Sequence, residues 1–223
     1  MPWFPKRAAA YAEYVTAPSR QLAAVPGGLP DSEAAALPLA GQTAWQALVD
    51  TARVQAGEHV LILAAAGGVG HLAVQIAKAR GARVTGTARA THHAWLRDLG
   101  ADALVDYVTE DVGRAGPADV VLDLIGGAAG LAALPAARDG GLFITIPSGA
   151  DVASLREAAN HRVRIVNMLV EPDHAGLEAL TALVAQGDLR IRVAHTFPLA
   201  DAASAHRMGE SGTIGGGKLV LLP

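Results

Sequence analysis

The chain contains no cysteine, so it has neither disulfide bonds nor thiolate ligands for zinc. Aromatic residues make up only 4% of it, which leaves Ala, Val and Leu to build most of the core. Its 18 Lys and Arg against 21 Asp and Glu give no basic surface for nucleic acid. No apolar run reaches the roughly 18 residues of a membrane span, and the N-terminus lacks the apolar segment of a signal peptide. These absences indicate a cytoplasmic protein without nucleic-acid or membrane partners.

The chain does have a regular alternation of short aliphatic runs and longer segments with helical spacing. This alternation is typical of βαβ units around a parallel sheet. We expect strands at 60–63, 83–87, 103–105, 119–124, 142–146 and 163–170, and helices at 70–80, 131–137, 152–160 and 174–185, with a further helix through Trp95. Six strands suit a doubly wound dinucleotide-binding sheet, so the predicted fold class is α/β.

Both ends of the chain differ from this middle part. We expect an isolated strand at 11–17, and a strand, a short helix and a strand at 191–197, 202–208 and 218–222. Too few strands are present to close a second sheet. The predicted division is therefore 1–30, a dinucleotide-binding domain at 31–188, and a C-terminal segment at 189–223, with the two ends belonging to one β-rich unit.

The most informative motif is VLILAAAGGVG at 60–70, which reads as a strand, a tight turn and a helix start. Its spacing Ala65-x-Gly67-x-x-Gly70 is the dinucleotide fingerprint with Ala in place of the first Gly. Gly67 would let the backbone approach a pyrophosphate, and Gly70 would let the helix pack on the strand. The alternative is a tight turn without a ligand. The residues that would receive the phosphates at the helix N-terminus are Ala66, Gly67, Gly68, Val69 and Gly70.

The end of the next strand favours one cofactor over the other. An NAD enzyme usually places Asp or Glu there, about 20 residues after the turn, to bind the ribose 2′-hydroxyl. This chain has Thr87, Ala88 and Arg89 instead. Arg forms a bidentate pair with a phosphate, whereas a carboxylate repels it. The sequence therefore favours NADPH, unless Arg89 is merely a solvated surface residue.

Several segments occur together in one order. They are AAALPLAGQTAW at 34–45, AAAGGVG at 64–70 followed by AVQIAK at 73–78, LGAD at 99–102, DLIGG at 123–127 and GKLVL at 217–221. These segments resemble the zinc-independent quinone oxidoreductase branch of the medium-chain dehydrogenase/reductase superfamily. The resemblance covers the chain from Tyr11 to its end, and it implies that most of the N-terminal GroES-like domain of that family is missing here.

The resemblance also implies a function and further site residues. NADPH would transfer hydride to a small-molecule substrate, a quinone or an α,β-unsaturated carbonyl, between a nucleotide domain and a GroES-like domain. Thr43 would lie near the nicotinamide, Gly126 and Gly127 near a ribose, and Tyr107 at the adenosine end. The alternatives are that Thr43 caps or packs within its own helix and that Tyr107 is half-buried core. Related enzymes dimerise through the last sheet strand, so a homodimer through 162–170 is expected.

Other kinds of site find little support. His92 and His93 are adjacent and point in different directions, which makes a poor chelate, so no metal is expected. His71 would either face solvent or approach a phosphate. No residue can be assigned as catalytic, because water or the cofactor ribose could supply the proton. Two functions remain open: an NADPH-dependent reductase, and a nucleotide-binding module without turnover that acts as a sensor or assembly component.

Overall fold

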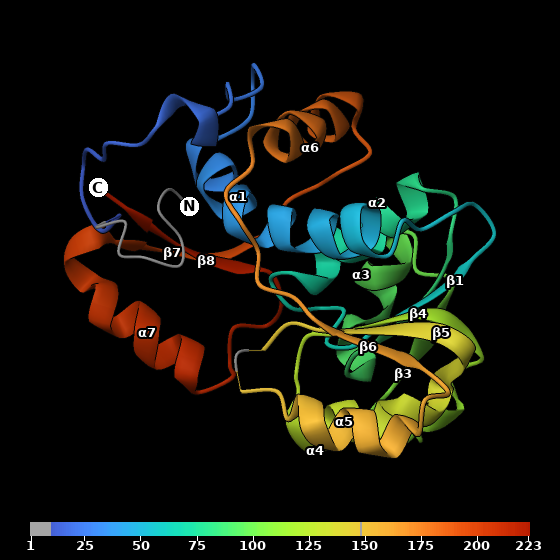
Figure 1. The fold of residues 1–223 in the computed structure, drawn as a ribbon. Helices are drawn as coiled ribbons and strands as arrows, with labels where there is room; N and C mark the ends of the chain where they lie inside the picture. The colour runs from blue at the N-terminus through green and yellow to red at the C-terminus, as the bar shows by residue number, and fades with distance from the viewer. Residues whose placement is uncertain (1–9, 148) are drawn as a thin grey trace. The chain divides into compact units, whose positions relative to one another are not determined.

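The computed structural model describes residues 10–147 and 149–223 (Figure 1). The chain forms two compact units. We call residues 44–169 the sheet unit, and residues 10–43 with 170–223 the flanking unit.

The sheet unit is built on six strands, and every neighbouring pair is parallel. The order across the sheet is β3-β2-β1-β4-β5-β6, which confirms the predicted doubly wound fold. The direction of strand order reverses between β1 and β4, and sheets of this kind bind their ligands at the carboxyl ends of the strands at such a point. The strands are β1 His59–Ile62, β2 Arg83–Thr87, β3 Ala103–Val105, β4 Ala118–Asp123, β5 Ala137–Thr145 and β6 Arg164–Asn167.

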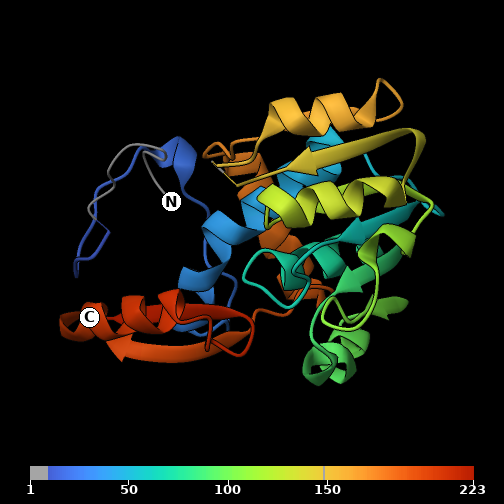
Figure 2. The ribbon, with the colours of Figure 1, turned by 90° about the horizontal axis from the view of Figure 1, so that it is seen from below.

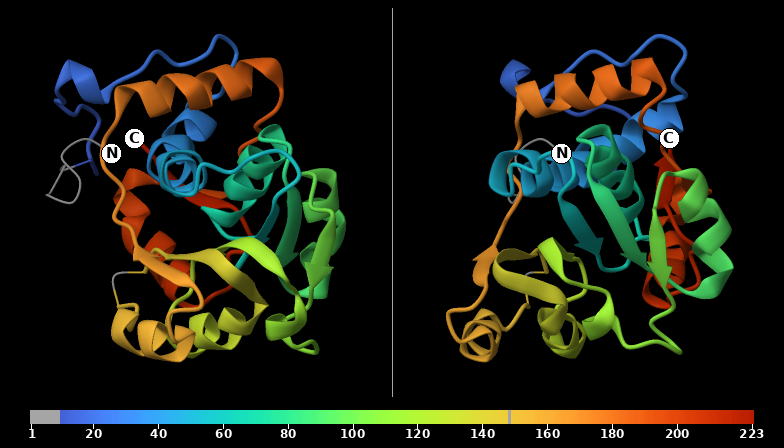
Figure 3. Two further views of the ribbon diagram at one scale, coloured as in Figure 1. Left: turned by 45° about the vertical axis from the view of Figure 1, so that its right-hand side comes forward. Right: turned by 90° about the vertical axis from the view of Figure 1, so that its right-hand side faces the viewer.

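Helices cover both faces of this sheet, as Figures 1 and 3 show. Helix α2 packs against β1 and β2, and α4 and α5 lie together on the other face. The helices of the sheet unit are α2 Gly70–Ala79, α3 His93–Asp98, α4 Gly127–Ala133 and α5 Val152–Ala159, with short segments η2 Gln46–Thr51, η3 Ala90–His92, η4 Val112–Arg114 and η5 Leu134–Ala136.

The core under α4 and α5 is aliphatic apart from one ring. Phe143 at its centre is fully buried, with Leu61 and Val121 from the neighbouring strands and Leu155 from α5. Because side chains alternate along a strand, Val60 and Ile62 point to the opposite face, toward α2. Burial on both faces explains why β1 and β4 read as continuous apolar runs.

The flanking unit contains α1 Asp31–Trp45 as far as Thr43, together with α6 His174–Gln186, β7 Val193–Pro198, α7 Ala202–Glu210 and β8 Lys218–Leu222, and the short segments η1 Ser19–Gln21 and η6 Leu199–Asp201. Helices α1 and α6 pack tightly, since a methyl group on Gly41 would lie 2.9 Å from a Leu180 methyl. Strands β7 and β8 are parallel, and α7 lies along them (Figure 2). Among the described residues, no helix is long and apolar enough to cross a membrane.

Three sequence-based element predictions are wrong. Residues 11–17 form no strand, and Tyr14 there is 91% exposed, because the segment has no strand to pair with among the described residues. The helix expected at 131–137 instead begins at Gly127 and ends at Ala133, after which η5 leads directly into β5. The strand expected at 163–170 is confined to Arg164–Asn167. Sequence periodicity does not reveal where the pairing of an edge strand stops.

A buried histidine sits at the amino end of the sheet. The ring of His59 is hydrogen-bonded to the Pro117 carbonyl and to Thr85 Oγ1, both at 2.8 Å. Burial lowers the pKa of His59 below its ordinary value of 6.5, against the opposing effect of the Pro117 hydrogen bond. The folded protein therefore favours the neutral ring, whereas the unfolded chain takes up a proton near its ordinary pKa.

We expect the free energy of unfolding to fall as the pH drops below about 6.5, because protons then bind the unfolded chain more readily than the folded one. The stabilising contribution is complete above that pH. Urea unfolding at several pH values, compared with the variant His59→Gln, isolates this histidine from the seven others. Parallel pH profiles for the two proteins would contradict the prediction.

Candidate functional site

The glycine-rich turn after β1 is held by the end of β2. The Ala64 N–H donates to Thr87 Oγ1 at 3.1 Å, and the Ala65 N–H donates to the Thr87 carbonyl at 2.9 Å. Thr87 is buried, so its hydroxyl positions the turn rather than facing solvent. Ala64 has a φ of 50°, a strained conformation for a residue other than glycine. Strain of this kind is concentrated at functional sites.

The two glycines of the fingerprint differ in how much space surrounds them. A methyl group on Gly70 would lie 2.2 Å from the Ala64 carbonyl oxygen and 2.7 Å from Ala65 Cα, which no packing adjustment can absorb. A methyl on Gly67 would lie 3.1 Å from the same oxygen and needs only a small shift. Gly70 is thus required by the packing of α2 on the turn, whereas Gly67 leaves room for another group.

The start of α2 presents backbone donors without protein partners. Within residues 10–147 and 149–223, the N–H groups of Gly68, Val69 and Gly70 meet no acceptor. Such amides, together with the positive end of the helix dipole, form an anion-binding site. Ala66 is nearly buried, and Gly67, Gly68 and Val69 are partly exposed. The turn therefore has the geometry and electrostatics of a phosphate cradle.

Gly86 in β2 lies against Ala65, the alanine of the fingerprint. The sequence analysis did not predict a role for Gly86. A methyl group on Gly86 would lie 2.7 Å from Ala65 Cβ. The side chain that replaces the usual first glycine of the motif therefore occupies space that Gly86 leaves free. A glycine inside a buried strand is unusual and marks close approach of another group, which is the signal that was available.

Two of the predicted residues meet at the edge of the sheet. Arg89 follows β2 and is exposed, and its Nε donates to the hydroxyl of Tyr107 at 3.1 Å. Tyr107 is 47% exposed, so it is neither fully buried nor fully solvated. No ion pair involves Arg89 in the part of the chain that the structure describes. Ala88 is buried, and its N–H donates to the Val105 carbonyl. The guanidinium is thus held through Nε, while its two terminal nitrogens are left to bind an anion.

A second glycine turn follows β4. Gly126 and Gly127 have φ values of 76° and 55°, and α4 begins at Gly127. Because β1 and β4 are paired neighbours, this turn lies at the same edge of the sheet as the Gly67 turn. The order of the strands thus brings the two glycine turns to either side of the switch point.

The remaining candidates lie in other surroundings. Thr43 belongs to the flanking unit, where it is buried and its hydroxyl donates to the Leu39 carbonyl one helical turn away at 2.7 Å. The expectation that His71 is exposed or approaches a phosphate is wrong. His71 is fully buried, and its Nδ1 lies 2.9 Å from the Gly67 carbonyl oxygen. His93 Nε2 lies 3.1 Å from the Ala88 carbonyl oxygen.

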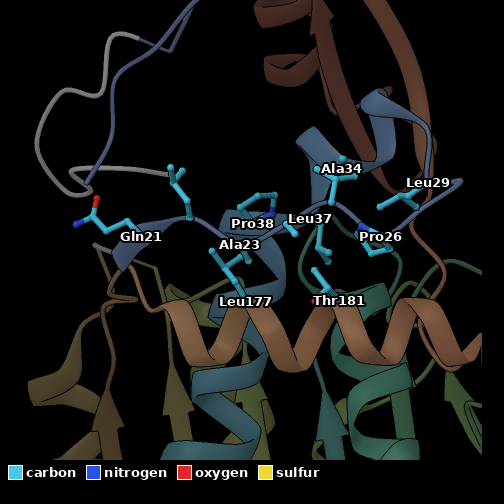
Figure 4. Close-up of a pocket in the computed structure, with 12 residues that line it drawn as sticks. Gln21, Ala23, Pro26, Leu29, Ala34, Leu37, Pro38, Leu177 and Thr181 are labelled. Carbon is cyan, nitrogen blue, oxygen red and sulfur yellow. The ribbon is translucent and has the colours of Figure 1, made fainter. Parts of the chain in front are cut away.

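A pocket in the flanking unit has a different character (Figure 4). It measures about 130 Å³ and lies between the segment 21–29 and helices α1 and α6. Leu37 and Leu177 are among its apolar lining residues, and Gln21 and Thr181 are the polar side chains among the described residues that line it. The Thr181 hydroxyl already donates to the Glu178 carbonyl. None of the described residues that line this pocket is charged, so they offer no partner for the phosphates of a nucleotide.

Comparison with known proteins identifies the family. The family model described as zinc-binding dehydrogenase matches residues 99–221. The 2-haloacrylate reductase of a Burkholderia species is 35% identical over 238 residues, covering 96% of this chain and 71% of that protein. This chain belongs to the zinc-binding dehydrogenase family. The match agrees with the medium-chain dehydrogenase/reductase superfamily expected from the sequence.

Solved structures and a larger relative complete the comparison. The structure of the quinone oxidoreductase from Coxiella burnetii superposes with a TM-score of 0.88 at 38% identity, covering 95% of this chain and 67% of that one. The mycocerosic acid synthase-like polyketide synthase of Mycobacterium tuberculosis is 36% identical over 219 residues. That match covers 89% of this chain but only 10% of the synthase. For two further relatives, this chain covers only about three fifths of the relative's own length.

The family description names zinc, but the described residues of this chain do not provide the ligands of a zinc site. The chain has no cysteine. Among the described residues, no group of three His, Asp or Glu side chains is placed to hold a metal ion. Structural and catalytic zinc sites need three or four such ligands. The chemistry proposed below therefore makes no use of a metal.

Proposed function

We propose that this chain is an NADPH-dependent oxidoreductase whose acceptor is a quinone or an α,β-unsaturated carbonyl compound. The observations that carry the proposal are the backbone donors at the start of α2 and, at the end of β2, an exposed Arg89 that forms no ion pair with any described residue. The names of the relatives, a quinone oxidoreductase and a haloacrylate reductase, support the acceptor class.

The residues of the sheet unit fit the dinucleotide. The amides of Gly68, Val69 and Gly70 would bind the pyrophosphate, with Ala66 and Gly67 lining its approach. Arg89, held by Tyr107, would pair with the 2′-phosphate, and Thr87 and Ala88 would shape the ribose contact. The backbone at Gly126 and Gly127 would run close to the nicotinamide ribose. The proposed contact of Thr43 with the nicotinamide rests on the family resemblance alone. The proposed division at residues 30 and 188 rests on the sequence pattern, in which both ends differ from the middle.

The cofactor, when bound, supplies hydride to the acceptor. The contribution of this chain is to bind and orient it. The turn amides neutralise the pyrophosphate, Arg89 selects the phosphorylated ribose, and the buried Thr87 keeps the turn fixed. No side chain of the sheet unit is assigned as a proton donor. In cofactor-dependent reactions the protein usually supplies binding, orientation and electrostatic stabilisation, and the cofactor supplies the chemistry.

Steady-state oxidation of NADPH, followed by absorbance with a panel of quinones and enones, tests the proposal. Acceptor-dependent oxidation that is slower with NADH is the expected result. The match to a tenth of a polyketide synthase favours one other function, a cofactor-binding component of a larger assembly. That function predicts cofactor binding without turnover by the chain alone. Absence of both binding and turnover would refute both.

We further propose a homodimer through β6. This strand is at the edge of the sheet, with β5 as its one neighbour, so its outer backbone groups are open to a second copy. Two edge strands related by a two-fold axis would satisfy each other. The exposed Leu169, at 57%, follows the strand and adds apolar surface.

Light scattering at micromolar concentration should report a dimer. The variant Ile165→Pro should shift it toward monomer or aggregate, because proline removes a backbone donor and stiffens the strand. Since Ile165 also packs on the core, circular dichroism must show that the variant is folded. A clean monomer for the unmodified chain would contradict the proposal.

A further inference from the structure

We propose that Asp123 is a positioning residue for the cofactor site. Its buried carboxylate would hold the turn at 124–127 in the conformation that receives the nicotinamide half of the cofactor. This inference rests on the proposed function, and it assigns a role to a buried acid that the proposed chemistry leaves unused.

The carboxylate of Asp123 is completely buried. Its Oδ1 accepts from the Ile125 N–H at 2.9 Å and the Gly126 N–H at 2.8 Å, and its Oδ2 accepts from the Thr145 hydroxyl at 2.9 Å. No ion pair to Asp123 is present in the described parts of the chain. A buried carboxylate is tolerated only when hydrogen bonds compensate for its lost hydration, and here three neutral donors do so.

These hydrogen bonds fix the turn that follows β4. Gly126 and Gly127 both lie in the left-handed region, which is reached easily but not held by glycine itself. The Ile125 side chain is 47% exposed and gives little anchorage. Two consecutive backbone amides therefore depend on one carboxylate oxygen. Without that oxygen they would be buried or partly buried donors lacking a partner, and the turn would leave its present conformation.

Helix α4 is adapted to the same carboxylate. A methyl group on Gly130 would lie 2.6 Å from Asp123 Oδ2. Glycine is unfavourable inside a helix, so its presence in the first turn of α4 is explained by the need for this close approach. The Gly130 N–H closes the same turn by donating to the Gly126 carbonyl. The acid, the turn and the helix start form one connected structure.

The position of the turn decides which half of the cofactor it would affect. The Gly67 turn follows β1, and Arg89 follows β2 on one side of it. The Asp123 turn follows β4, on the other side of the switch point. With the pyrophosphate at β1 and the phosphorylated ribose at β2, the nicotinamide half must extend toward β4. Loss of Asp123 should therefore weaken the nicotinamide half alone.

Calorimetric titration with two probes tests this: NADPH, and adenosine 2′,5′-bisphosphate, which carries only the adenosine half. For Asp123→Ala we expect NADPH affinity to fall by about tenfold or more, as for buried donors left unpaired. Affinity for adenosine 2′,5′-bisphosphate should stay within about twofold. Asp123→Asn, which retains one oxygen for the two amides, should lie between the unmodified protein and Asp123→Ala.

Two glycine-to-alanine variants separate the effect of the contact with Asp123 from a general effect of alanine on helices. Gly130→Ala should weaken NADPH binding while sparing the bisphosphate, although alanine favours helix formation. Gly209→Ala in α7, where a methyl would meet only a Leu219 carbon at 3.9 Å, should change neither. If Asp123→Ala fails to fold by circular dichroism, Asp123→Asn and Gly130→Ala decide the question.

Unchanged NADPH affinity in the folded variants, or an equal loss for both probes, would overturn the proposed role of Asp123. If neither probe binds the unmodified protein, the proposed function has failed, and the role of Asp123 fails with it. The two failures are therefore told apart by the unmodified protein alone.

Discussion

Gly67→Val should abolish NADPH binding and leave the fold largely intact. The valine side chain would occupy the space through which a pyrophosphate approaches the amides of Gly68 and Val69. The protein itself can accommodate the change, since the added Cβ would lie 3.1 Å from a single carbonyl oxygen, that of Ala64. Circular dichroism combined with a cofactor titration measures both effects in one preparation.

The choice of Gly67 over Gly70 makes this experiment interpretable. A side chain at Gly70 would collide with the turn backbone at 2.2 Å, so loss of binding there would report on folding. Gly27→Val is the matched control, because a Cβ at Gly27 meets no atom within 4 Å. A folded Gly67→Val protein that binds NADPH as tightly as the unmodified chain would rule out the phosphate cradle.

Arg89→Ala should weaken NADPH binding by about 1–3 kcal/mol, the range for hydrogen bonds to a charged group, and leave NADH binding nearly unchanged. The guanidinium is already oriented by Tyr107, so little freedom is lost when it binds a phosphate. Isothermal titration of both cofactors against the variant measures the difference.

Two further variants define the role of Arg89. Arg89→Lys keeps the charge but loses the forked geometry, so its NADPH affinity should be intermediate. Arg97→Ala removes an exposed arginine of α3 and should affect neither cofactor. Equal losses for NADPH and NADH in Arg89→Ala would mean that Arg89 does not read the 2′-phosphate.

The elements that could be predicted from the sequence are those whose signal is local. The strand at 83–87 is bounded by Gly81 and by the change to polar residues, and its predicted bounds match β2. The turn at 64–70 was recognisable because glycine spacing and the flanking apolar runs lie within eleven residues. Helix α4 was misplaced although the Asp123 carboxylate holds the turn before it through N–H groups only two and three residues away; only the third hydrogen bond of Asp123, from Thr145, joins residues distant in sequence.

Contacts between residues distant in sequence account for the rest. Gly86 is explained by Ala65, twenty-one positions earlier, and Gly130 by the carboxylate of Asp123. The hydrogen bond between Arg89 and Tyr107 joins two residues that were predicted separately. His71 looked exposed because it opens a helix, yet it is buried, and its ring contacts Trp95 of α3. The position of a residue in the first turn of a helix does not indicate which other elements pack against its side chain.

The central claim is that the Gly67 turn and Arg89 form a site for NADPH. Titration of the unmodified protein with NADPH and NADH in the same buffer tests it most directly. We predict one NADPH bound per chain, with an affinity about tenfold or more above that for NADH, as expected for a charge-assisted phosphate contact. Tighter binding of NADH, or no binding of either cofactor by the folded protein, would contradict the claim.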